Sequence, residues 1–132
     1  MFKKLDHIAI AVRDTEKALV LYRDTMGLPL LHSEVLEGPG VRLTHLDMGN
    51  LQLQLVEPLN PEHPISKFLD ERGDGLHHLC WQVPEIEEAM ADLAKHGLKT
   101  RPNEPHDAPK GKKAAFIEPS LTHGVLWEMT EG

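Results

Sequence analysis

The chain is poor in several features that each define a class of protein. Cys80 is its only cysteine, so it cannot form an internal disulfide and is expected to fold in a reducing compartment. It has no long uncharged apolar run to span a membrane, and "MFKKLDHIAIAV" turns charged again at Arg13 and Asp14 before any small-residue site typical of signal-peptide cleavage. Its 14 basic against 21 acidic residues give a net charge of -7, which argues against a nucleic-acid-binding surface. These absences predict a cytoplasmic protein whose partner is neither a membrane nor a nucleic acid.

The chain does have the size and composition of one ordinary globular domain. Its 132 residues are 40% hydrophobic and 27% charged, enough to build a core. It also holds nine histidines, an unusual supply of metal-capable side chains for this length. The local metal motifs H-x-E-x-x-H and C-x-x-C are absent. A metal site would therefore need ligands from distant parts of the sequence.

One structural plan occurs twice along the sequence. "LDHIAIAVRDTEKALVLYRDTMGL" and "LHHLCWQVPEIEEAMADLAKHGL" each combine a short apolar strand, a helix-start signal, an amphipathic helix and a glycine. His7 falls on His78 and Ala18 on Ala89 at an offset of 71 residues, and Gly27 falls on Gly97 at an offset of 70. An internal repeat of this kind predicts two copies of one supersecondary unit.

Strand-like runs separated by turn residues follow each helix. The first copy has them at 30–36, 41–48 and 51–57, and the second at 98–102, 113–119 and 124–130. The order βαβββ therefore occurs twice, which predicts an α+β fold. We expect one domain over residues 1–132, with module one at about 1–60, a connector helix at about 61–74 that buries Ile65, Phe68 and Leu69, and module two at about 75–132.

Two adjacent histidines open the strand-like run "GLHHLCWQV", and neighbouring residues on a strand point to opposite faces. His78 matches His7 in the repeat, whereas His77 matches Asp6. We therefore predict that His78, rather than His77, carries the chemistry.

A polar side chain also recurs in the last strand of each module, as Gln54 and Glu128, which lie 74 residues apart. With His7 and His78 they can converge if the modules lie side by side about a pseudo-twofold axis. Two imidazole nitrogens and two oxygens suit a divalent ion such as Co²⁺, Mn²⁺, Ni²⁺, Zn²⁺ or Fe²⁺. The plainer alternative is that the histidines only cap strands while the other two residues satisfy backbone groups.

Several stretches of the sequence resemble one enzyme family nearly end to end. They are "LDHIAIAV" with "LYRDTMGL", then "GVRLTHLDMGNLQLQLVEPL", "HPISKFLDERGDGLHHLCWQV" and "FIEPSLTHGVLWEM". The chain is similar in these stretches to the vicinal oxygen chelate (glyoxalase/bleomycin resistance) superfamily and, within it, to the methylmalonyl-CoA epimerases. The resemblance implies a cupped mixed sheet built from two βαβββ modules, and a cytoplasmic homodimer that interconverts (2R)- and (2S)-methylmalonyl-CoA.

The resemblance also implies a metal cofactor and its ligands. The family's metal positions fall on His7, Gln54, His78 and Glu128, and Co²⁺ is the favoured ion. The implied reaction removes the α-proton of the acyl-CoA substrate and passes through a metal-stabilised enolate. A base must take the proton from one face and an acid must return it on the other.

The general base is the point at which the resemblance is incomplete. Some epimerases have a glutamate where this chain has Leu43. His45 lies on the same strand face as Leu43, and Glu128 is the other candidate, so both are expected catalytic residues.

Other functions of the same fold stay open at this point. A glyoxalase I would use a similar metal set on a glutathione hemithioacetal, and ethylmalonyl-CoA could replace methylmalonyl-CoA. A ring-cleaving dioxygenase would use a two-His, one-carboxylate Fe²⁺ site, against which Gln54 as a fourth ligand counts. A metal-free binding or resistance protein would line a drug pocket with the same residues. The modules could pair within one chain or across a swapped dimer.

Overall fold

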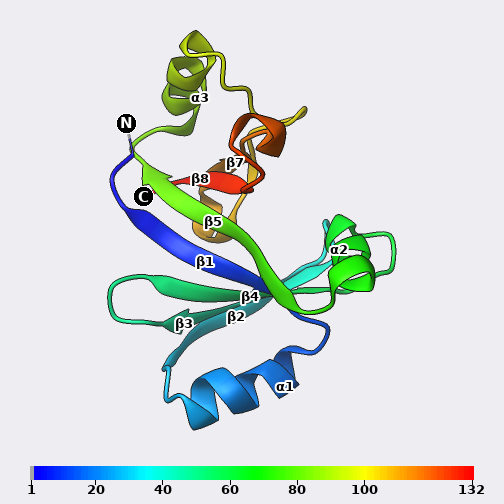
Figure 1. Cartoon of the computed structure of the whole chain (residues 1–132). Helices are drawn as coiled ribbons and strands as arrows, with labels where there is room; N and C mark the ends of the chain where they lie inside the picture. Colours follow the sequence, from blue (N-terminus) through cyan, green and yellow to red (C-terminus); the bar gives the residue numbers. More distant parts are fainter. Residues whose placement is uncertain (1) are drawn as a thin grey trace. The chain divides into compact units, whose positions relative to one another are not determined.

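The computed structural model describes residues 2–132, which divide into two compact units. One unit holds residues up to His7 together with His78–Gly132, and the other holds Ile8–His77. The elements are β1 (Leu5–Ala11), α1 (Thr15–Leu19), the π-helical turn η1 (Val20–Thr25), β2 (Leu30–Leu36), β3 (Val41–Asp47), β4 (Gln52–Pro58), α2 (Pro64–Arg72), β5 (Gly75–Val83), α3 (Ile86–Lys95), β6 (His106–Asp107), η2 (Pro109–Gly111), β7 (Lys113–Phe116), η3 (Pro119–Leu121) and β8 (Trp127–Glu131). Figure 1 labels the three α-helices and all the strands except β6. No helix among residues 2–132 combines the length and the apolar character that a membrane crossing needs.

The predicted fold class is confirmed. The order βαβββ occurs on each side of α2, and the strands form mixed pairings, because β5 and β8 run parallel whereas β7 pairs antiparallel with both β6 and β8.

The unit at 8–77 is an antiparallel β2-β3-β4 sheet flanked by helices. Residues 8–11 of β1 lie beside β4. The connector holds α2, whose Ile65, Phe68 and Leu69 pack against Leu43 and Val56. α2 begins after His63, whose Nδ1 accepts the N–H of Ile65 at 3.1 Å.

The other unit orders its strands β5-β8-β7-β6, with residues 5–7 of β1 beside β5 (Figure 1). One face of these strands is the core under α3, where Val83, Ala115 and Met129 pack against the helix residues Ile86, Ala89 and Leu93. Side chains alternate between the faces of a strand. The neighbours of these core residues in each strand therefore gather on the opposite face, which carries the polar side chains described below.

The prediction of a strand at 98–102 is wrong. That segment makes only an isolated bridge, between Thr100 and Ile117, and the edge strand lies further along at β6. Pro102 has no N–H to donate to a ladder, and Asn103 has a φ of 66°, so the chain turns instead of extending. This shift brings His106, rather than residues 98–102, to the edge of the sheet.

Candidate metal centre

The strand register brings three of the predicted ligands together in one unit. In the parallel pair β5–β8, Cys80 lies opposite Glu128, and His78 is two residues before Cys80 on the same face. His7 comes from β1, which lies beside β5. His7, His78 and Glu128 are all buried, and each offers a ligand atom within 4.8 Å of the others.

The two imidazoles face a single carboxylate oxygen. Glu128 Oε1 lies 3.3 Å from His7 Nε2 and 3.1 Å from His78 Nε2. The two Nε2 atoms are 3.4 Å apart, and the rings meet nearly edge to face at 77°. Two nitrogens and one oxygen that converge at such distances form a donor set for a borderline divalent ion.

The electrostatics of the centre favour an ionised carboxylate. Burial alone would raise the pKa of Glu128, but hydrogen bonds from His106, His7 and His78 hold it well below its usual range. Burial alone would lower the pKa of His7, but its contacts with Asp6 and Glu128 raise it to about 9. Without an ion, the negative charge of Glu128 is therefore balanced by protonated imidazole.

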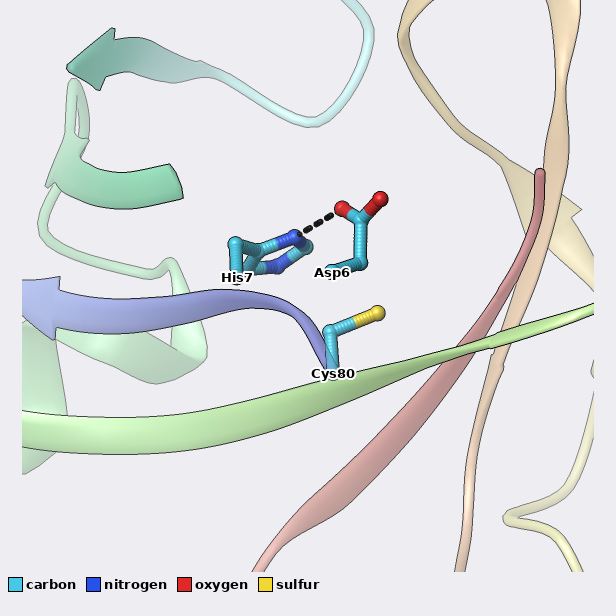
Figure 2. Close-up of side chains that lie close together, drawn as sticks. All are labelled: Asp6, His7 and Cys80. Atoms are coloured by element: carbon cyan, nitrogen blue, oxygen red, sulfur yellow. Dashed lines mark hydrogen bonds and ion pairs between the residues drawn. The ribbon is translucent and has the colours of Figure 1, made fainter. Parts of the chain in front are cut away.

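Asp6 and Cys80 flank His7 on its other side. Figure 2 shows the Asp6 carboxylate facing the His7 ring, with Cys80 close by; His7 Nδ1 donates to Asp6 Oδ2 at 2.7 Å, and Gln82 Nε2 donates to Asp6 Oδ1 at 2.8 Å. Burial, together with the charges of Glu128 and Asp6, raises the pKa of the Cys80 thiol, so it stays protonated and is a poor metal ligand. Asp6 and Cys80 therefore only support His7, and the donor set is the one that His7 and His78 form with Glu128.

Gln54 and His45, the other predicted site residues, lie in the unit at 8–77 and bond to each other. His45 Nδ1 donates to Gln52 Oε1 at 2.8 Å, and His45 Nε2 accepts from Gln54 Nε2 at 3.2 Å. In this arrangement the Nε2 lone pair of His45 faces the Gln54 amide. The oxygen of the Gln54 amide is the atom left to offer an ion, and its role as a ligand stays a prediction from the sequence.

The two adjacent histidines have different surroundings. The ring of His77 lies edge-on against Phe68 of α2, with 5.0 Å between the centroids. His78 is buried beside Glu128. His78 therefore lies in the polar centre of its unit, and its role in the chemistry stays a prediction from the repeat.

His106 is a member of the centre that the sequence did not reveal. Its Nε2 lies 3.2 Å from Glu128 Oε2 and its Nδ1 lies 2.8 Å from Glu104 Oε1. Burial lowers its pKa, but the two carboxylates outweigh this and raise it to about 9. Nothing in "PNEPHDAPKGKK" marks this histidine, because only the position of β6 brings it near Glu128.

Comparisons with known proteins identify the family. A model of the glyoxalase/bleomycin resistance protein/dioxygenase superfamily matches residues 6–116. An uncharacterized protein of Bacillus subtilis is 36% identical over 97% of this chain and 91% of its own length. The mitochondrial methylmalonyl-CoA epimerase of Mus musculus is 34% identical over 97% of this chain and 72% of its own length.

Solved structures agree with this assignment. The crystal structure of methylmalonyl-CoA epimerase from Mycobacterium tuberculosis superposes with a TM-score of 0.92 at 32% identity, over 98% of this chain and 88% of that one. A methylmalonyl-CoA epimerase in complex with methylmalonyl-CoA and NH₄⁺ superposes with a TM-score of 0.91 at 32% identity, over 100% of this chain and 96% of that one. The chain therefore belongs to the glyoxalase/bleomycin resistance protein/dioxygenase superfamily and, within it, to the family of methylmalonyl-CoA epimerases.

Proposed function

We propose that the protein is a divalent-metal-dependent epimerase that interconverts (2R)- and (2S)-methylmalonyl-CoA by proton transfer at the α-carbon. The observation that carries the proposal is the buried set His7, His78 and Glu128, in which two imidazole Nε2 atoms face one carboxylate oxygen. Support for the substrate comes from the family, one of whose solved members holds methylmalonyl-CoA.

The residues present fit a divalent ion such as Co²⁺, Mn²⁺, Ni²⁺, Zn²⁺ or Fe²⁺, with Co²⁺ favoured. Glu128 is held ionised, and His7 donates its Nδ1–H to Asp6. Once the Nε2 proton is lost, the Nε2 lone pair faces the ligand position. When bound, the ion supplies a Lewis acid that stabilises negative charge on the thioester oxygen as the α-proton leaves. Gln54 is our candidate for a fourth ligand, on the strength of the sequence repeat and the family resemblance.

Three side chains can be compared as the general base that removes the α-proton. Glu128 is a weak base, because its pKa is low and both of its oxygens are engaged by imidazoles, so its geometry favours the role of a ligand. Leu43 is buried in the apolar cluster below α2 and cannot act as an acid or a base. His45 is on the same strand face, and its Nε2 accepts a hydrogen bond from the Gln54 amide at 3.2 Å. We keep it as the candidate base because a nitrogen that accepts a hydrogen bond can also accept a proton.

The test is hydrogen exchange at the α-carbon. Single-epimer methylmalonyl-CoA is incubated in D₂O with Co²⁺-loaded and with chelator-treated protein, and the α-proton signal is followed by NMR. We expect loss of that signal and appearance of the other epimer only with the loaded protein. A loaded protein that leaves the signal unchanged would refute the proposal, and the same samples would then be assayed with ethylmalonyl-CoA and a glutathione hemithioacetal.

The remaining proposals come from the family resemblance. We propose that the protein is a cytoplasmic homodimer made of one domain over residues 1–132. Sedimentation of the purified protein tests the dimer, because a monomer at micromolar concentration would contradict it.

A further inference from the structure

The two oxygens of Glu128 have separate partners. Oε1 faces the Nε2 atoms of His7 and His78, at 3.3 and 3.1 Å. Oε2 lies 3.2 Å from His106 Nε2. Glu128 therefore offers one oxygen to the donor set and keeps the other in a hydrogen bond.

Several contacts hold His106 in the position from which it bonds to Glu128 Oε2. Its Nδ1 is 2.8 Å from Glu104 Oε1, and the other oxygen of Glu104 accepts the backbone N–H of Phe116. The His106 ring stacks on the Phe116 ring at 15°, with centroids 5.3 Å apart. The strand register also fixes the position of His106. His106 pairs with Ala114 in β6–β7, and Phe116 pairs with Glu128 in β7–β8.

We propose that His106 is a positioning residue that keeps Glu128 bound to a divalent ion through Oε1 only. This inference rests on the metal site of the proposed function. A carboxylate can bind a metal through one oxygen or both. Two-oxygen binding would require Oε2 to leave the N–H of His106, so the hydrogen bond favours the one-oxygen mode. A coordination position is thereby left for an oxygen of the substrate, as a catalytic metal site requires.

Three substitutions separate the hydrogen bond from packing. His106→Phe keeps a ring to stack on Phe116 but has no N–H. His106→Gln places an amide N–H near the position of Nε2 and can still donate to Glu128. His106→Asn places its amide near Nδ1, within reach of Glu104 only. His96→Phe, at an exposed histidine that follows α3, is the matched control.

The first measurement is the affinity for Co²⁺, by titration calorimetry on the full chain, with far-UV circular dichroism to confirm folding. Hydrogen-bonded partners of metal ligands contribute about 10- to 100-fold in affinity, so we expect His106→Phe and His106→Asn to raise Kd by about that factor. His106→Gln should stay within about threefold of the wild type and His96→Phe should match it. The visible absorption of bound Co²⁺, which reports coordination number, should change in the Phe and Asn variants only.

The outcomes separate this inference from the proposed function. If the wild type binds Co²⁺ and the Phe variant has the same Kd and spectrum, the positioning role is refuted while the metal site stands. The role is also refuted if Gln, Asn and Phe all weaken binding equally, because packing alone would then explain the loss. A wild type that binds no divalent ion would overturn both, and the D₂O exchange assay would still report separately on epimerisation. If the Phe variant fails to fold, the test is the comparison of His106→Gln with His106→Asn. The positioning role requires the Asn variant to bind Co²⁺ more weakly than the Gln variant.

Discussion

At neutral pH, a divalent ion must displace a proton from His7 in order to bind. Burial disfavours the charged imidazole, but Asp6 and Glu128 outweigh this and raise the pKa of His7 to about 9 in the ion-free protein. A metal needs an unprotonated nitrogen. Below pH 9 the free site therefore holds a proton that the occupied site must lose, and affinity for the ion falls as the pH is lowered.

The magnitude follows from that pKa. Near pH 7 the pKa of His7 lies about two units above the pH, so proton competition weakens binding about 100-fold, which corresponds to about 2.7 kcal/mol. From pH 7 to pH 8 binding should strengthen about tenfold, and the gain should shrink to about fivefold from pH 8 to pH 9 as the pH reaches the pKa. His106 has a raised pKa as well, but both its nitrogens face carboxylates that stay beside it when an ion binds, so it should contribute little to the proton release.

Titration calorimetry in buffers of different protonation enthalpy measures the affinity for the ion and the number of protons released when it binds. We expect about one proton released per ion near pH 7, and an affinity that rises about tenfold from pH 7 to pH 8. Asp6→Asn removes a charge that supports the His7 proton, so this variant should release a smaller fraction of a proton at the same pH. An affinity independent of pH, with no proton release, would refute the assignment of His7 as a ligand.

Three further predictions concern ligation, catalysis and stability. Gln54→Ala should weaken metal binding by at least about tenfold, as judged by calorimetry, whereas Gln52→Ala, which removes the other amide bonded to His45, should leave it unchanged. His45→Ala should bind the ion but lose about 10²-fold or more in turnover in the NMR exchange assay, and unchanged turnover of both epimers would exclude His45 as the base. Met129→Ala, at a side chain with 0% exposure under α3, should lower the free energy of unfolding in urea by about 2–5 kcal/mol, against less than about 0.5 kcal/mol for Leu76→Ala, which is 60% exposed.

The sequence predicts much of this fold because its hydrophobic periods agree with its turn residues. The run at 30–36 is β2 residue for residue, and the runs at 41–48 and 51–57 are β3 and β4 to within one residue at either end. The predicted strand at 124–130 begins late, at Trp127, since η3 and its following turn occupy the preceding residues. These elements are local, and local propensity and alternation suffice to place them.

The segment between α3 and β7 is the part of the fold that the sequence does not predict. Its polar residues, prolines and glycines show no hydrophobic period. The run "LKTRP" is predicted as a strand, but Pro102 cannot donate to a ladder. Where β6 joins the sheet depends on pairing between His106 and Ala114, which is a tertiary contact. The partner of Glu128 Oε2 was therefore invisible in the sequence, whereas His7 and His78 could be found because the repeat marks their positions.

Leu43 shows how the missing glutamate changes the problem of proton transfer. In this chain the side chain at that position is part of a hydrophobic cluster with Val56 and with Ile65 and Leu69 of α2. A carboxylate placed there would have to leave that cluster or be buried without charge, at a cost of several kcal/mol. The core of this unit is thus built around an apolar residue, and under the proposed function a different group has to carry the proton. His45 is a consistent choice, because the side-chain oxygen of Gln52 accepts from its Nδ1 and so favours the tautomer with the lone pair on Nε2.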